Sequence, residues 1–210
     1  MLILSSLYLP PIQYFAHLYA DPVAIEDQGE HFIKQTYRNR CLIATPNGPQ
    51  ALTIPVVRDG SGGHTPMHDV RISSHGNWRH LHWNALVSAY ENSPYFEYYA
   101  DDFQALFDRP YDRLANFNTD LRSLILELLQ LTPQIRVSTD YVTPLPAAAT
   151  DLRTLIAPKA TIESDPSFQP KAYYQVFQER TGFQPNLSIV DLLFNLGPES
   201  RLILKQSLNH

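Results

Sequence analysis

Residues 40–57, RCLIATPNGPQALTIPVV, contain the strongest hairpin signal in the chain. Two runs of apolar and β-branched residues flank Asn47-Gly48, and both of these residues tolerate the positive φ angles of a tight turn. We therefore expect antiparallel strands at 40–45 and 51–57. Similar alternation predicts strands at 2–9, 22–26 and 70–73, so the first part of the chain is predicted to form a sheet.

From Asn77 the apolar residues recur at steps of three and four, as they do on one face of a helix. This period predicts a helix that starts at Asn77 and carries Trp78 and His82 on its apolar stripe. Ser93-Pro94 is expected to cap a second helix, which ends before Arg109-Pro110. A third helix is predicted from about residue 112 to 131.

The last 70 residues are predicted to be a long proline-rich connection followed by one helix. The connection spans 140–170, with a short helix near 150–156. Near the C-terminus, Ser188 and Asp191 fit a capping box in which Asp replaces Glu, and Gly197-Pro198 fits a helix stop. We predict a single α/β (mixed α+β) domain over residues 1–210, in which an N-terminal mixed β-sheet packs with a central group of α-helices and a short capped C-terminal helix.

Composition excludes several classes of protein. The net charge of −5 argues against non-specific binding to nucleic acid, which needs a broad basic field. The apolar start of the chain lacks a basic region and a cleavage pattern, and no apolar run approaches the roughly 20 residues of a membrane-spanning helix. With a single cysteine, Cys41, an internal disulfide cannot form. We expect a cytoplasmic protein that does not bind nucleic acid and does not span a membrane.

A small basic cluster stands out against this acidic background. Lys34 is one of only four lysines, and it lies close in sequence to Arg38, Asn39 and Arg40. Arginine forks bind phosphate or carboxylate oxygens in pairs, and lysine adds a point charge. The cluster therefore suggests a clamp for an anionic small molecule. The alternative is that all three cations pair with the surplus acids on a solvated surface.

Two groups are candidates for proton transfer. Asp27, beside Glu26, ends a predicted strand, where an open α/β sheet presents its ligand crevice. The alternative for Asp27 is an ordinary turn, because DQGE is typical turn chemistry. His82 lies one turn after Trp78 on an apolar helix face, where burial could tune the imidazole for general acid or base catalysis. The alternative for His82 is a hydrogen-bonded core residue.

Other motifs are weaker. His64 and His68 suggest a metal, but they adjoin glycines and a proline in a predicted loop rather than on a helix, so we predict no metal site. The stretch RDGSGGH, 58–64, lacks the Gly-Lys-Ser/Thr ending of a phosphate-binding loop. Cys41 is expected to be buried and inert. The aromatic rings of the helical region, Tyr90 among them, could stack on sugars, although most are expected in the core. No cofactor or oligomeric state can be named.

Five blocks in order resemble the WbqC-like protein family. They are LYLPPIQYF (7–15), KQTYRNRCLI (34–43), LTIP (52–55), NWRHLHWNALVSAYENSPYF (77–96) and FQPNLSIVDLLFNLGP (183–198). The resemblance implies a role near cell-surface polysaccharide synthesis, because members are commonly encoded beside O-antigen genes. Many members begin with His-Gln-Pro where this chain has Leu4, Ser5 and Ser6. The positions that match the family are Asp27, Lys34, Asn39, Arg40, Trp78, His82, Tyr90, Ser188 and Asp191.

These observations lead to one main hypothesis and two alternatives. The main one is a transferase-type enzyme of surface-polysaccharide assembly that acts on a phosphate-bearing or nucleotide-linked sugar. Lys34, Arg38 and Arg40 would hold the anion, Asn39 would orient it, and His82 or Asp27 would move the proton, while Trp78 and Tyr90 would contact the substrate. The first alternative is a non-catalytic ligand-binding or assembly protein of the same pathway. The second, RNA binding through 31–40, is a minor one because of the acidic charge.

Overall fold

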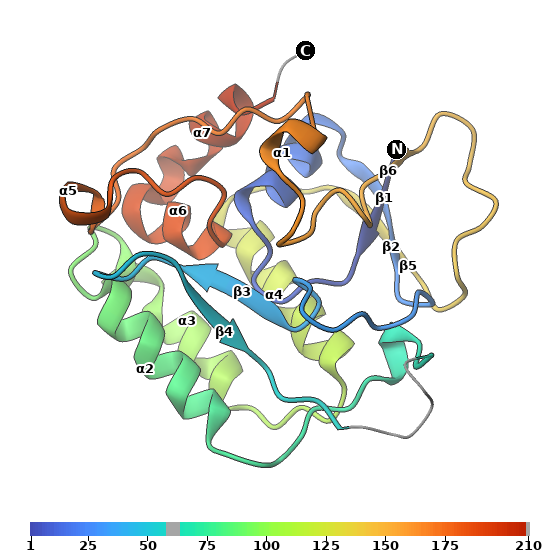
Figure 1. Ribbon diagram of the computed structural model, residues 1–210, viewed down its shortest axis with the longest axis horizontal. Coiled ribbons are helices and arrows are strands. Elements are labelled where there is room, and N and C mark those ends of the chain that lie inside the picture. The colour runs from blue at the N-terminus through green and yellow to red at the C-terminus, as the bar shows by residue number, and fades with distance from the viewer. Residues whose placement is uncertain (58–63, 209–210) are drawn as a thin grey trace.

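The computed structural model describes residues 1–57 and 64–208. Its α/β architecture confirms the predicted fold class (Figure 1). The strands divide into two separate sheets, a parallel sheet and an antiparallel hairpin. Most of the glycine-rich stretch considered as a phosphate loop, 58–63, lies outside the described residues. Within the described ranges, no helix is long and apolar enough to cross a membrane.

The parallel sheet has the order β5-β2-β1-β6, with β1 at Leu2–Ser5, β2 at Val23–Asp27, β5 at Gln134–Ser138 and β6 at Thr150–Asp151. The predicted strand at 2–9 is too long, because the chain turns at Leu9, where φ is 40°. After Pro10-Pro11, helix α1 (Ile12–Ala20) crosses to β2. Seven of the nine residues of α1 are buried, and the sequence analysis missed this helix because it interpreted the apolar start of the chain as a strand.

The hairpin forms as predicted. Strands β3 (Arg40–Ile43) and β4 (Gln50–Thr53) pair antiparallel, and Gly48 adopts a φ of 100° in the turn. The predicted strand at 70–73 was wrong. Arg71 and Ile72 form only isolated bridges, to Arg113 and Val56 respectively, so this segment links the end of the hairpin to the start of the third helix.

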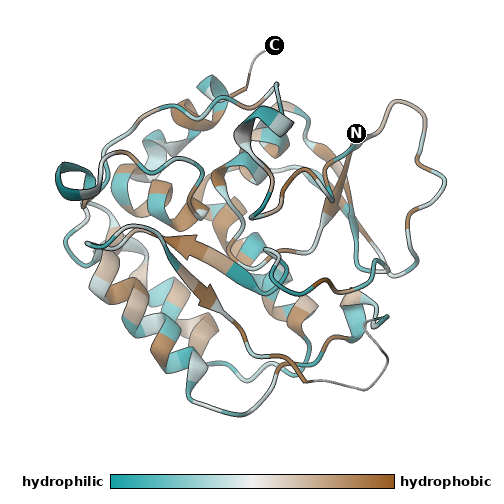
Figure 2. Ribbon diagram, in the orientation of Figure 1, coloured by the Kyte–Doolittle hydropathy of each residue, from teal (hydrophilic) through white to brown (hydrophobic). Residues whose placement is uncertain are grey.

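Three central helices follow as predicted: α2 (Trp78–Tyr90), α3 (Phe96–Asp108) and α4 (Leu114–Leu128). Many of their apolar residues belong to the hydrophobic core. Figure 2 shows that hydrophobic and hydrophilic stretches alternate along α2. Ser93 does not cap the second helix. Its hydroxyl donates to the carbonyl oxygen of Tyr90 at 2.6 Å, at the end of α2.

The C-terminal region carries more helix than predicted. Helix α6 (Ile189–Leu196) is confirmed, but α7 (Ser200–Gln206) and the short α5 (Gln178–Thr181) were missed. The predicted helix at 150–156 was wrong, because this segment contains β6. Short 3-10 helices occur at Met67–Asp69, Ile162–Ser164 and Gly197–Glu199.

The predicted capping box is absent. The Ser188 hydroxyl donates instead to the carbonyl oxygen of Leu9 at 2.8 Å, which ties α6 to the turn after β1. The Asp191 carboxylate faces the core. It accepts hydrogen bonds from the hydroxyls of Tyr90 at 3.0 Å and Tyr173 at 2.6 Å, and from the side-chain amide of Gln175 at 3.0 Å. Both residues therefore stabilise tertiary contacts rather than the first turn of α6.

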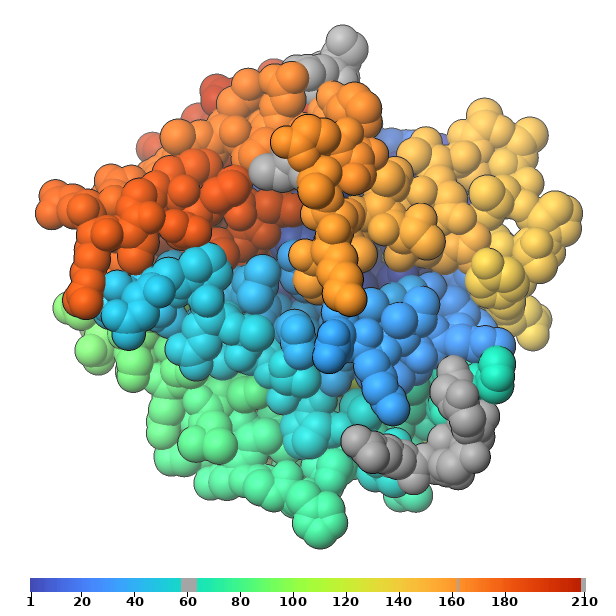
Figure 3. Space-filling view, viewed as in Figure 1, coloured from blue at the N-terminus to red at the C-terminus, as the bar shows by residue number. Residues whose placement is uncertain are grey.

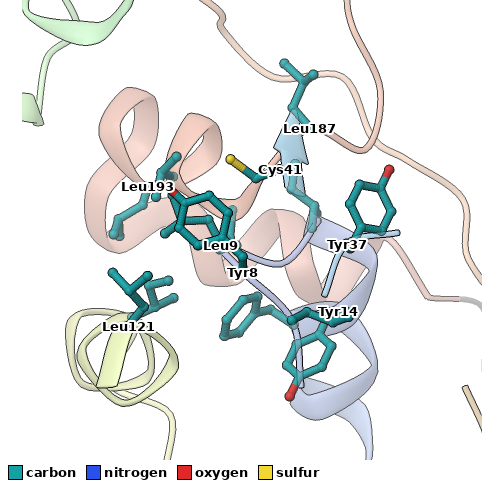
Figure 4. Close-up of a cluster of buried hydrophobic side chains, with 14 of the residues drawn as sticks. Tyr8, Leu9, Tyr14, Tyr37, Cys41, Leu121, Leu187 and Leu193 are labelled. Carbon is teal, nitrogen blue, oxygen red and sulfur yellow. The ribbon is translucent and has the colours of Figure 1, made fainter. Parts of the chain in front are cut away.

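One continuous core joins the two sheets and the helices. In Figure 4, Cys41 lies among buried side chains that include Leu9, Leu187 and Leu193. Burial raises the pKa of the Cys41 thiol well above its usual range, so the thiolate nucleophile is disfavoured. The prediction that Cys41 is buried is confirmed.

Gly197 is a conformational requirement of this core. Its φ is 53°, and an added Cβ would lie 2.4 Å from the ring of Tyr95. We expect Gly197→Ala to lower the free energy of unfolding by about 2 kcal/mol, because strain at positive φ adds to a steric clash. Gly182→Ala is the matched control, since Gly182 also has positive φ but meets nothing within 4 Å. Urea denaturation should show a larger loss for Gly197→Ala, and equal losses would contradict the clash.

Candidate functional site

A cavity of about 350 Å³ opens where the parallel strands end. Strands β2 and β6 terminate at Asp27 and Asp151, and the segments that follow them form the cavity walls. The long connection between β5 and β6 projects from the molecule beside it (Figures 1 and 3). The lining residues are Gly29, Glu30, His31, Ile33, Arg38, Tyr141, Asp151, Arg153 and Thr154. Ligands of open α/β sheets bind outside the carboxyl ends of the strands, so this position favours a binding site.

Asp27 fixes three chain segments around this cavity. One carboxylate oxygen accepts the backbone N–H groups of Gly29 and Glu30, each at 3.0 Å. The other accepts the N–H of Val142 at 3.1 Å and the guanidinium of Arg153 at 2.5 Å. The side chain is fully buried. Because each oxygen already accepts two hydrogen bonds, the geometry favours a positioning role for Asp27 over proton transfer.

The Asp27 carboxylate thus forms a junction between the segments at residues 29–30, 142 and 153. Gly29 allows two of the chain segments at this junction to come close together. An added Cβ would lie 2.2 Å from the backbone carbonyl carbon of Asp140, so the segments after β2 and β5 touch through their main chains. Only glycine allows so close an approach without displacing backbone.

Arg153 joins the junction to the cavity surface. It donates from Nε and Nη2 to the Asp151 carboxylate at 2.9 and 2.7 Å, and its guanidinium lies 4.7 Å from the centre of the Tyr141 ring. These hydrogen bonds lower the pKa of Asp151, which therefore stays ionised at neutral pH. Asp151 and Arg153 thus form a bidentate ion pair on the cavity wall.

Glu30 and Arg38 form a second, more deeply buried pair. Arg38 donates from Nε and Nη2 to the two oxygens of Glu30 at 3.0 and 2.5 Å, and Nη2 also reaches the hydroxyl of Ser5 at 3.2 Å. Burial raises the pKa of Glu30, although the nearby Arg38 partly offsets that rise. A carboxyl group with a raised pKa in a cavity is a candidate for proton transfer.

The other members of the basic cluster lie outside this pair. Lys34 is exposed and forms no ion pair with the residues that the structure describes, although its neighbour Ile33 lines the cavity. Arg40 lies on β3 and donates from Nε to the hydroxyl of Thr53 at 3.1 Å. Asn39 donates from its side chain to the carbonyl oxygen of Ile54 at 2.8 Å, which supports the hairpin. Of the proposed clamp, only Arg38 lines the cavity.

His82 and Trp78 belong to the core between α2 and the turn after β1. The Nδ1 atom of His82 lies 2.9 Å from the hydroxyl of Tyr8, and the rings of His82 and Trp78 contact each other edge to face at 5.3 Å. Burial lowers the pKa of His82 to about 4, so the imidazole is neutral at physiological pH. Neither residue lines the cavity at the strand ends. The arrangement fits the alternative of a hydrogen-bonded core histidine.

Tyr90 is also a core residue. Its hydroxyl accepts the N–H of Ala44 at 3.1 Å and donates to Asp191 at 3.0 Å, and it too is absent from the cavity lining. Of the candidate residues, the structure therefore places Arg38 in the cavity wall and Asp27 buried behind that wall, and it places the others elsewhere.

Comparison with known proteins identifies the family of this chain. The WbqC-like protein family matches residues 6–163, which is most of the chain. The chain belongs to the WbqC-like protein family. A Mycobacterium tuberculosis protein named "Uncharacterized protein Rv1507c" is 29% identical over 222 aligned positions, and the alignment covers 94% of each chain. No solved structure shows significant similarity.

In this member of the WbqC-like family, the cavity residues that sequence reasoning missed include Glu30, Tyr141, Asp151 and Arg153. Glu30 follows directly on the turn DQG, which was recognised only as turn chemistry. The other three come from the stretch treated as a proline-rich connection. The available signal was Asp151-Leu-Arg153, an acid and a base two residues apart, which is too common to indicate a site by itself.

Two further buried polar clusters lie away from the cavity. Glu26 pairs with Arg122 of α4, and His17 of α1 lies 2.7 Å from Asp165. Within residues 1–57 and 64–208, no group of three or more His, Cys, Asp or Glu side chains has the geometry of a metal site.

Proposed function

We propose that this WbqC-like protein is a transferase-type enzyme of cell-surface polysaccharide assembly that acts on a phosphate-bearing or nucleotide-linked sugar. The observation that carries the proposal is the cavity at the carboxyl ends of the parallel strands, with buried Glu30 in its wall. Family membership supports the pathway. The cavity volume of about 350 Å³ suits a sugar ring, and small-molecule sites have similar volumes.

In this proposal the sugar enters the cavity and its phosphate remains near the rim. Lys34, which is exposed beside the lining residue Ile33, contacts the phosphate. Glu30 accepts the proton of an acceptor hydroxyl or amine as that group attacks the sugar carbon. The bond from this carbon to the phosphate oxygen breaks, and the phosphate group leaves with the electron pair. Arg38 holds the Glu30 carboxylate in place through its two hydrogen bonds.

Tyr141 offers a direct test of the binding step. It lines the cavity and is 54% exposed, so Tyr141→Ala removes a contact surface without opening the core. We expect the affinity for nucleotide sugars or sugar phosphates identified in a thermal-shift screen to fall about tenfold, because an aromatic ring supplies a stacking surface. Tyr98→Ala is the matched control, since Tyr98 is 76% exposed on α3. A wild-type protein that ignores every such ligand would contradict the proposal.

A specific observation also favours a second candidate, a non-catalytic ligand-binding or assembly protein of the same pathway. Leu4, at the position of the histidine in the His-Gln-Pro triplet, is fully buried and cannot transfer a proton. Product analysis separates the two functions. Incubation of the protein with its ligand and candidate acceptors yields a new glycoside or glycosylamine only if the protein is an enzyme, and Glu30→Gln should then abolish turnover while binding persists.

A further inference from the structure

The charges around the cavity are unequally accessible. The side chains of Arg38, Glu30 and Arg153 are only 5%, 6% and 8% exposed, whereas that of Asp151 is 29% exposed. Asp27 is fully buried behind Arg153. The charge that a ligand can reach most readily is therefore the carboxylate of Asp151, and it is negative.

Both arginines are already engaged by protein groups. Besides Glu30 and Ser5, Arg38 donates to the Thr36 hydroxyl at 3.2 Å. Arg153 donates to Asp27, Asp151 and the carbonyl oxygen of Val142. Each guanidinium thus uses all three of its nitrogens in protein hydrogen bonds, which leaves little capacity for a bidentate phosphate contact.

The net charge of the side chains around the cavity is also negative. Among the described residues, Glu30 and Asp151 line the cavity with Arg38 and Arg153, and the fully buried carboxylate of Asp27 lies behind Arg153, so the carboxylates of this group outnumber its guanidiniums by one. Exposed His31 also lines the cavity. A poorly hydrated cavity amplifies such an excess, because charges interact more strongly there than in water. The cavity therefore favours a bound cation and disfavours a bound anion.

We propose that the cavity binds the protonated amine of an amino sugar, with the Asp151 carboxylate as its direct partner. This inference rests on the proposed function, since it names the class of sugar that enters the same cavity. Asp151 remains ionised because Arg153 stabilises its charge. The phosphate group of this sugar stays at the rim of the cavity, where solvent and salt screen it from the excess negative charge.

Isothermal titration calorimetry with three probes tests the inference: glucosamine 1-phosphate, N-acetylglucosamine 1-phosphate and glucose 1-phosphate. They share a phosphate and differ at one substituent, an amine, an amide or a hydroxyl. We expect glucosamine 1-phosphate to bind about tenfold more tightly than the other two, as a charge-assisted hydrogen bond would give. This preference should disappear above the pKa of the sugar amine, where the amine is neutral.

Asp151→Asn should remove the preference for the amine. Asp140→Asn is the matched control, because Asp140 is exposed on the connection that leads to β6 but does not line the cavity. If Asp151→Asn is unstable, the pH dependence of the preference for glucosamine 1-phosphate still tests the inference, because it is measured on the wild-type protein.

The outcomes separate this inference from the proposed function. Equal affinities for the three sugar phosphates would overturn the amine site and leave the function standing. Free glucosamine serves as a fourth probe, and its binding without binding of any sugar phosphate would support the amine site and contradict the phosphate-bearing substrate. No binding of any probe would overturn both.

Discussion

Asp27→Ala is expected to destabilise the protein by about 3–5 kcal/mol, because it leaves a buried guanidinium without one of its carboxylates and three buried or partly buried N–H groups without an acceptor. The donors affected are the backbone of Gly29, Glu30 and Val142 and the side chain of Arg153. For a chain of this length, the midpoint of thermal unfolding should fall by roughly 10 °C. Thermal denaturation followed by circular dichroism measures this shift.

Asp101→Asn is the control for this variant, since Asp101 is exposed on α3. Its effect should stay within about 0.5 kcal/mol. A change of similar size for both variants would show that Asp27 does not hold the segments together. Limited proteolysis adds a second readout, because loss of the junction should expose the segments after β2 and β5 to cleavage.

The second large effect is the pH dependence of the free energy of unfolding, to which two buried groups contribute in opposite directions. Burial lowers the pKa of His82 to about 4 and raises the pKa of Asp191 to about 6. As pH falls from 6.5 to 4, the unfolded chain binds a proton at His82 that the folded protein refuses, so His82 costs stability. Between pH 6 and 4 the folded protein binds a proton at Asp191 that the unfolded chain does not bind, so Asp191 adds stability.

Each shift corresponds to about 3 kcal/mol, so the two contributions nearly cancel in the wild-type protein. His82→Gln should make the protein gain stability on acidification from pH 6.5 to 4 relative to wild type. Asp191→Asn should make it lose stability over pH 6 to 4. Urea denaturation at a series of pH values checks both slopes. Parallel pH profiles for wild type and both variants would show that neither group titrates as described.

The sequence predicted those elements whose residues alternate or recur in a regular way. The hairpin at Asn47-Gly48 and the helices that start near Trp78 and Phe96 were found because local pattern determines them. Helix α1 was missed because it continues the apolar start of the chain, which was interpreted as a strand. Strand β6 was missed because two residues, Thr150 and Asp151, are too few to show alternation.

The candidate site was harder to predict for a different reason. Asp27 was singled out correctly as the end of a strand, but its role depends on partners more than 100 residues away, Val142 and Arg153. The basic cluster at 34–40 was interpreted as one clamp, whereas the chain directs Arg38 inward to Glu30 and Arg40 toward Thr53 on the hairpin. Sequence spacing does not reveal such divergence when no regular element sets the side-chain directions.

The contact between Gly29 and the backbone of Asp140 has a consequence for anyone who wishes to redesign this pocket. The two main chains leave no room for a side chain, so neither wall can be remodelled alone without pushing the other aside. Changes of ligand preference are better sought at His31, Ile33 and Thr154, which line the opening without taking part in that contact. The residues that hold the two walls together, Gly29 and Asp140, are therefore different from the residues at which ligand preference can be altered.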